Sequence, residues 1–221
     1  MYKKLLIASA VLVAAAGAHA QASSATFDMT GTVTPASCDI TLTGGNVADY
    51  GVNESANLRK STLGGTTNQH YVLISKSIPW TVSCTAATPL QLVFTDAKAG
   101  KALPFDTATD SYRFGLVDGT GTAAIGSFTV ALTGVTIDGA SAAGLLLGTA
   151  GQNGWIATNA GFAAPGKANG FIKTAGLTAP STLTIVKGSA DVVASLGKTY
   201  VDGSVSTITL NGGATITLQY L

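Results

Sequence analysis

Charged side chains are scarce in this chain. They make up 10% of the 221 residues, and Glu54 is the only glutamate. The net charge of +1 leaves no basic excess to attract nucleic acid or acidic lipid. Glycine, serine, threonine, alanine and valine dominate instead, a composition that disfavours helices and suits strands joined by glycine-rich turns. We therefore expect an all-β fold that does not bind nucleic acid.

Histidine is nearly absent, which narrows the possible chemistry. Only His19 and His70 occur, and no cysteine pair has the spacing of metal ligands. A Ser-His-Asp arrangement would have to use His70, which directly precedes an expected strand. The aspartates are scattered among turns with no sign of a glycosidase pair. We expect no catalytic residues, no bound metal and no cofactor.

One apolar run is present, and it is short. Leu5–Ala16 follows the basic start Met1–Lys4 and precedes Ala18–Ala20, which fits a small-x-small cleavage site. A membrane anchor is the competing interpretation, but a span needs roughly 20 apolar residues. We interpret residues 1–20 as a secretory signal peptide and expect an exported mature chain that begins at Gln21. Loss of Lys3 and Lys4 would bring the net charge to about −1.

The chain has two cysteines, Cys38 and Cys84. In an exported protein one such pair most simply forms one disulfide. Closing a loop of roughly 47 residues would stabilise the fold by about 4 kcal/mol through the unfolded state. Two buried free thiols are the alternative.

Alternating apolar and polar residues predict strands along most of the chain. The clearest is Tyr71–Cys84, in which Val72, Ile74, Ile78, Trp80, Val82 and Cys84 share one face, with Pro79 marking an edge or a bulge. Further strands are predicted at 27–33, 39–43, 89–95, 111–117, 127–133, 181–186 and 204–210. Residues 44–68 are expected to form a long connection, and 191–196 one helical turn. Residues 139–179 are compatible with short strands or with a surface loop.

The chain ends on a strand of its own. Ala214–Leu221 alternates without a break, and Asn211-Gly212 is a strong hairpin signal, so we expect the last strand to fold back on its predecessor. These strands predict a single β-sandwich of immunoglobulin-like type with one disulfide. The antibody signature is absent, because Trp80 lies four residues before Cys84 on the same strand.

Several motifs resemble those of a known family. Gly31-Thr-Val33 followed by Cys38, together with the penultimate Tyr220, resembles subunits of chaperone–usher pili. The chain is more similar still to a fimbrial-like branch of Gram-negative proteins, domain of unknown function 1120. The stretches that carry this second resemblance are Ile78–Cys84, Phe94–Gly100, Tyr112–Leu116, Ile125–Phe128 and Gly213–Leu221.

The resemblance implies a pilin-type sandwich over residues 31–221 that lacks its last strand, and an N-terminal extension over residues 21–30. It also implies a disulfide joining the first strand to the end of the second. The groove left by the missing strand would be lined or bordered by Ile208, Leu210, Ala214, Ile216, Leu218 and Tyr220. Ala25, Phe27 and Met29 would belong to a donor strand that fills the groove of a neighbour.

The implied partners are a periplasmic chaperone, an outer-membrane usher and other pilus subunits or copies of this chain. The implied location is the periplasm and then the surface of a Gram-negative cell. In the alternative interpretation Tyr220 is a plain core residue that ends a complete sandwich. A second hypothesis is a monomeric adhesin that binds a host or surface glycan through Tyr50, Trp155 and Phe162, which would otherwise be anchors under loops.

Overall fold

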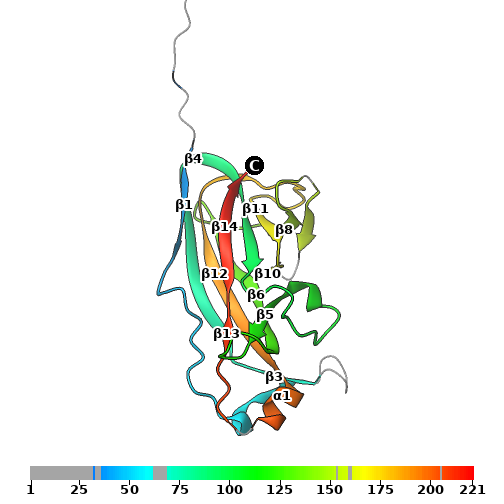
Figure 1. Cartoon of the computed structure of the whole chain (residues 1–221). Helices are drawn as coiled ribbons and strands as arrows, with labels where there is room; N and C mark the ends of the chain where they lie inside the picture. Colours follow the sequence, from blue (N-terminus) through cyan, green and yellow to red (C-terminus); the bar gives the residue numbers. More distant parts are fainter. Residues whose placement is uncertain (1–31, 33–35, 62–68, 153, 159–160, 205) are drawn as a thin grey trace, which may run out of the picture. The chain divides into compact units, whose positions relative to one another are not determined.

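Strands make up nearly all the regular structure of the computed structural model, which describes residue 32 and residues 36–61, 69–152, 154–158, 161–204 and 206–221 (Figure 1). The strands are β1 (Cys38–Leu42), β2 (Arg59–Ser61), β3 (His70–Val72), β4 (Lys76–Asp96), β5 (Arg113–Val117), β6 (Ala124–Ile137), β7 (Ala140–Ser141), β8 (Gly144–Thr149), β9 (Ile156–Thr158), β10 (Phe162–Ala163), β11 (Lys167–Ile172), β12 (Thr182–Gly197), β13 (Asn211–Gly212) and β14 (Ala214–Tyr220). Two 3-10 turns (Ser55–Asn57 and Asp110–Tyr112) and one short helix, α1 (Lys198–Gly203), complete this part. The all-β prediction is confirmed.

Strand β4 links the two layers of the fold. Its first part pairs with β1 and β12, and its last part, Leu90–Asp96, pairs with β14. Strand β11 pairs with this last part from the other side. Figure 1 shows β4 arching from one layer to the other. All these pairings are antiparallel, so the fold is a curled, sandwich-like antiparallel sheet.

The core lies between the inner faces of the two layers. Even-numbered residues of β4 contribute from both of its parts, Trp80 and Val82 from the first and Leu92 and Phe94 from the second. Phe171 of β11 packs against Trp80, with ring centroids 5.6 Å apart. The predicted inward face of Trp80, Val82 and Cys84 is confirmed.

Cys38 and Cys84 form the predicted disulfide. They are register partners at the start of β1 and in the first part of β4. The bond therefore joins β1 to the middle of the sheet at the end where the chain enters its first described strand.

The predicted strand Tyr71–Cys84 is wrong in its middle. Strand β3 ends at Val72 and β4 begins at Lys76, and between them Ile74 is 82% exposed. Lys76 is the one even-numbered residue that departs from the apolar pattern, and it lies where β4 begins, so it was the available signal of this break. In the following stretch, the predicted strand at 89–95 is the second part of β4 rather than a separate element.

The helical turn expected at 191–196 is also wrong. These residues lie in β12, where they pair with β6 on one side and with β3 and β4 on the other. Val192 and Val193 are β-branched and suit a strand that has a neighbour on both edges. The only described α-helix, α1, follows directly after β12 and was not predicted.

The expected hairpin at Asn211-Gly212 does not form. The described residues of 204–210 lie in no strand, so the strand predicted there is wrong as well. Asn211 and Gly212 instead form β13 and pair with Val117 and Leu116 of β5. A Cβ at Gly212 would lie 2.9 Å from Leu116 Cδ1, so the glycine allows a close approach rather than a turn. After Gly213 the chain crosses to the other layer as β14.

Two stretches that the sequence left open are now assigned. Residues 139–179 contain the short strands β7–β11, apart from the undescribed positions 153, 159 and 160. The described part of the expected connection over 44–68 contains the 3-10 turn Ser55–Asn57 and the short strand β2 and is otherwise irregular. No helix within the described ranges is long and apolar enough to cross a membrane.

Candidate functional site: an open groove between two strand edges

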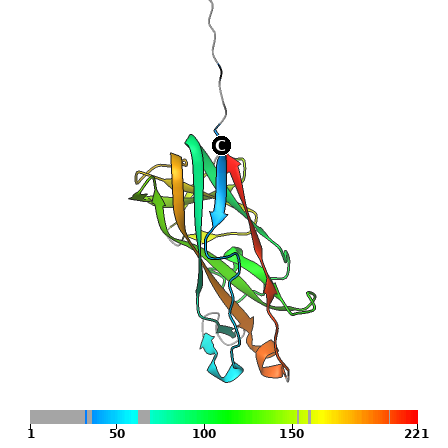
Figure 2. The ribbon, with the colours of Figure 1, turned by 90° about the vertical axis from the view of Figure 1, so that its left-hand side faces the viewer.

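An apolar hollow lies between β1 and β14. We call it the open groove, and its volume is about 540 Å³. It is lined by Ile40, Leu42, Asn46, Val47, Ala48, Tyr50, Ile78, Phe94, Leu116, Phe128, Val130, Ala190, Val192, Ala194, Leu210, Gly212, Gly213, Ala214 and Ile216. Figure 2 shows β1 and β14 side by side, with the C-terminus at the start of β1, and the hydrogen bond between Cys38 N and the Tyr220 hydroxyl confirms that the two strands are close.

The groove floor belongs to the hydrophobic core, and its rim meets solvent. Phe94 and Ala194 on the floor are each 1% exposed, whereas Leu42 and Val47 on the rim are 38% and 73% exposed. Almost every lining side chain is apolar. An extended segment with apolar side chains on one face would bury this rim, at about 25 cal/mol for each Å² of apolar surface removed from water.

The main chain of β1 offers a free edge to the groove. Ser37 O accepts a hydrogen bond from Thr85 N and Thr43 N donates one to Pro79 O, so odd-numbered residues of β1 bond to β4. Because successive residues of an antiparallel strand face opposite edges, Ile40 and Leu42 direct their N–H and C=O groups away from β4. Within the described part of the chain, these groups have no main-chain partner.

Strand β14 offers a matching free edge. Gly213 O accepts from Ala97 N, and Leu221 N donates to Pro89 O, so odd-numbered residues again bond to β4. Ala214, Ile216 and Leu218 therefore direct their main-chain groups away from β4. Among the residues described, β14 has β4 as its single strand partner. Two facing strand edges with unpaired main-chain groups have a strong tendency to accept another strand.

Tyr220 closes the groove at the Cys38 end. Its hydroxyl accepts a hydrogen bond from Cys38 N at 2.8 Å, which links β14 to β1 across the gap between them. The Tyr220 hydroxyl thereby replaces the carbonyl oxygen of a neighbouring strand as the acceptor for Cys38 N. Tyr220 is 50% exposed, so it is not a plain core residue.

Tyr50 occupies the opposite end, at the break between β3 and β4. Its hydroxyl donates to Val192 O at 2.9 Å and accepts from Ala194 N at 3.1 Å. In this way a side chain fills the gap that the break leaves along the edge of β12. Burial raises the pKa of Tyr50 to about 12, so the phenol stays protonated at physiological pH.

The structure places the predicted groove residues as follows. Leu210, Ala214 and Ile216 line the groove. Ile208 and Leu218 are half-buried and pack against the core beside it, and Tyr220 lies at its Cys38 end. The predicted donor residues Ala25, Phe27 and Met29 lie outside the described residues, as do the signal peptide and the extension.

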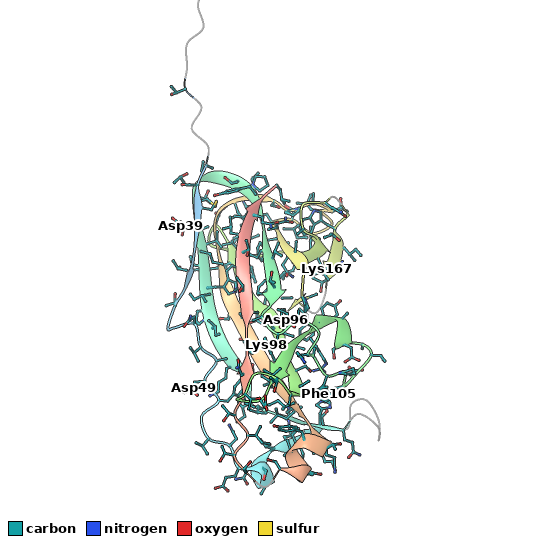
Figure 3. All side chains as sticks on the ribbon, viewed as in Figure 1. Asp39, Asp49, Asp96, Lys98, Phe105 and Lys167 are labelled. Atoms are coloured by element: carbon teal, nitrogen blue, oxygen red, sulfur yellow. A yellow bond between two sulfur atoms is a disulfide. The ribbon has the colours of Figure 1, made fainter. Side chains whose placement is uncertain are left out.

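Sequence reasoning missed the other wall of the groove. Ile40 and Leu42 continue the even-numbered series that starts at Cys38, and this alternation was the available signal. For Val47 and Tyr50 no local signal exists, because Tyr50 bonds to residues more than 140 positions away. Asp49, which precedes Tyr50 in the chain, lies on the same side of the fold as β1 (Figure 3). Asp96 lies at the end of β4, and its carboxylate accepts a hydrogen bond from Gly115 N.

The aromatic residues proposed for glycan binding make separate contacts. Trp155 lies against Gly148 and Gly170, Phe162 against Tyr112, and Tyr50 against β12. None of these contacts joins two of the three residues. The structure thus adds no observation in favour of an aromatic platform built from them.

His70 is buried beneath the short segment before β5. Its ring stacks on Phe105, with the centroids 4.4 Å apart, and Arg113 lies over the same Phe105 ring. Burial lowers the pKa of Arg113, and nearby Asp110 opposes that shift. In the described residues, no group of three or more His, Cys, Asp or Glu side chains is placed to hold a metal ion.

Comparison with known families supports one part of the sequence interpretation. The model of the family described as protein of unknown function DUF1120 matches residues 27–148, more than half of the chain. The chain belongs to this family. The matched region contains β1 and β4–β6, and so includes much of the groove floor. No curated protein and no solved structure matches the chain significantly.

Proposed function

We propose that this DUF1120 protein is a structural subunit of a surface pilus, and that its open groove accepts the N-terminal extension of a neighbouring subunit. The mature chain would begin at Gln21 and the extension would comprise residues 21–30. A periplasmic chaperone would occupy the groove first, and an outer-membrane usher would guide the exchange. The observation that carries the proposal is the apolar groove between the two free strand edges of β1 and β14.

The donor segment has the pattern that the groove requires. If this segment is extended when it binds, Ala25, Phe27 and Met29 would share one of its faces. Their apolar side chains would enter the groove, and the donor main chain would bond to β1 and β14. Main-chain hydrogen bonds would then supply affinity, and the alternating side chains would set the register.

The position of the chain start supports assembly into a fibre. Strand β1 begins at the closed Cys38 end of the groove, and the groove extends from there toward Tyr50. An extension that leaves one subunit near Cys38 and fills the groove of another makes two different surfaces meet. Such head-to-tail contacts generate open filaments unless the rotation between subunits closes a ring.

The exposed groove also explains why the proposal includes a chaperone. A groove with exposed apolar side chains and unpaired main-chain groups promotes aggregation before assembly. A partner that temporarily supplies a strand would protect it.

The test compares two neighbouring residues of the donor segment. The full chain is expressed in the periplasm of a Gram-negative host, and unheated samples are separated on a denaturing gel. We expect the wild type to form ladders that dissociate on heating, and we expect deletion of Gln21–Thr26 to abolish them. Phe27→Ser should reduce the ladders strongly, whereas Asp28→Ser, on the opposite face, should leave them intact.

Two results would overturn the proposal. One is a folded, soluble wild-type monomer with no ladder at any concentration. The other is an equal effect of Phe27→Ser and Asp28→Ser, because an inserted strand must distinguish its two faces.

A further inference from the structure

The wall of the groove is a regular strand along β1 and becomes irregular after Leu42. Beyond Leu42, residues 44–49 continue along the groove but belong to no strand, and we call this segment the lip. Asn46, Val47 and Ala48 of the lip line the groove. In the described structure no main-chain hydrogen bond joins the lip to another element.

The lip is fixed at both ends. At one end Thr43 N donates to Pro79 O, which is the last bond between β1 and β4. At the other end Tyr50 is held by its two hydrogen bonds to β12, while the ammonium of Lys76 lies 5.9 Å from its ring centroid. A local bond from Asn53 Nδ2 to Tyr50 O braces the same residue.

Two consecutive glycines follow the first fixed end. Gly44 and Gly45 have φ angles of 81° and 102°, in the region that residues with a side chain rarely adopt, and neither has a neighbour within 4 Å of an added Cβ. The chain can therefore change direction here at low energetic cost. The lip thus begins with a glycine pair and ends next to the firmly bonded Tyr50.

We infer that the lip closes over the donor strand and forms the second wall of its binding site. This inference rests on the proposed function and identifies which residues of this chain contact the occupant, the extension of a second copy. The unpaired main chain of the lip extends the short free edge of β1 toward Tyr50. Val47 is the main contact residue, since its exposed side chain already faces the groove and a bound strand would bury it.

The chain contains a matched control for this role. Val52 is the same residue type, lies five positions further along and is 98% exposed, but it does not line the groove. In the sequence, Val47 precedes Tyr50 and Val52 follows it. Replacing either valine by aspartate removes an exposed apolar side chain, so the fold of the empty protein should tolerate both changes.

The experiment uses a fluorescein-labelled peptide of residues 21–34 and the full chain. Peptide binding is followed by fluorescence anisotropy for the wild type, Val47→Asp and Val52→Asp, and thermal unfolding checks each fold. We expect Val47→Asp to weaken binding by about tenfold or more, because the lost contact buries most of a valine side chain and the new carboxylate would be desolvated. Val52→Asp should bind like the wild type.

The outcomes separate the two proposals. If the peptide binds the wild type and both variants equally, the lip has no role and this inference fails while the proposed function stands. Equal weakening by both variants also overturns the inference, because it would reflect added negative charge rather than contact. If the peptide binds neither the wild type nor the chain that lacks Gln21–Thr26, whose groove is not filled by a neighbour, the proposed function fails and the inference with it.

Discussion

Two tyrosine hydroxyl groups act in this fold as main-chain groups act elsewhere in a sheet. Tyr220 Oη accepts from Cys38 N at one end of the open groove. Tyr50 Oη bonds to both Val192 O and Ala194 N at the other end. The two side chains satisfy polar groups that a continuous strand would otherwise pair, and they mark the limits of the groove.

Removing the Tyr50 hydroxyl should destabilise the domain. In Tyr50→Phe, Val192 O and Ala194 N lose their partner while the ring is kept, and we expect a loss of about 1–3 kcal/mol of unfolding free energy. Tyr112→Phe is the control, because the Tyr112 ring lies tilted against Phe162, with centroids 5.8 Å apart, and no hydrogen bond of its hydroxyl is present among the described residues. Urea unfolding measures both variants. Equal stability of Tyr50→Phe and the wild type would show that this hydroxyl contributes nothing.

The same residue should also affect the pH dependence of stability. Burial raises the pKa of Tyr50 from 10.0 to about 12, so folding favours the protonated phenol. This contribution is complete below pH 10 and is lost as the pH rises through 12. The wild type should therefore lose more stability than Tyr50→Phe between pH 10 and 12. Parallel pH profiles of the two proteins would contradict the role of burial.

The period-two pattern predicted single strands well wherever one face is buried. It located β14 to within one residue and the inward face of Trp80 and Val82, because burial of one face leaves a clear signal in the sequence. The pattern failed where pairing with strands distant in sequence decides the secondary structure. The local hairpin signal of Asn211-Gly212 was overridden by pairing with β5, and pairing on both edges placed Val192 in a strand.

The close approach of Gly212 to Leu116 gives a direct test of the pairing between β13 and β5. A Cβ at Gly212 would lie 2.9 Å from Leu116 Cδ1 and 3.1 Å from Gly115 O, whereas at Gly213 its nearest neighbour would be Ala97 Cβ at 3.6 Å. Gly212→Ala should thus cost about 1 kcal/mol or more of unfolding free energy through overpacking. Gly213→Ala should be nearly neutral. The reverse order, measured by thermal unfolding, would mean that β13 does not pack on β5.

At the scale of the whole described fold, the decisive feature is the apolar hollow between the free edges of β1 and β14. The sequence predicted the C-terminal side of this groove through Leu210, Ala214 and Ile216. It did not predict the side formed by β1 and the lip, because irregular segments have no periodic signal. Whether another strand fills the groove depends on residues outside the described part of the chain, so it stays a prediction that only assembly can test.

Cross-linking between two variants of the full chain, each with one added cysteine beside the Cys38–Cys84 disulfide, tests this prediction most directly. Ala25→Cys is introduced in one chain and Ala214→Cys, on the groove rim, in another, and the two are co-assembled and treated with a short bismaleimide. Ala87→Cys, exposed on the arch of β4 and outside the groove, replaces Ala214→Cys in the control. We predict a cross-linked heterodimer with Ala214→Cys and none with Ala87→Cys. If both positions react equally or neither reacts, or if a chain carrying both Ala25→Cys and Ala214→Cys cross-links only within itself, the groove does not take its strand from a neighbour.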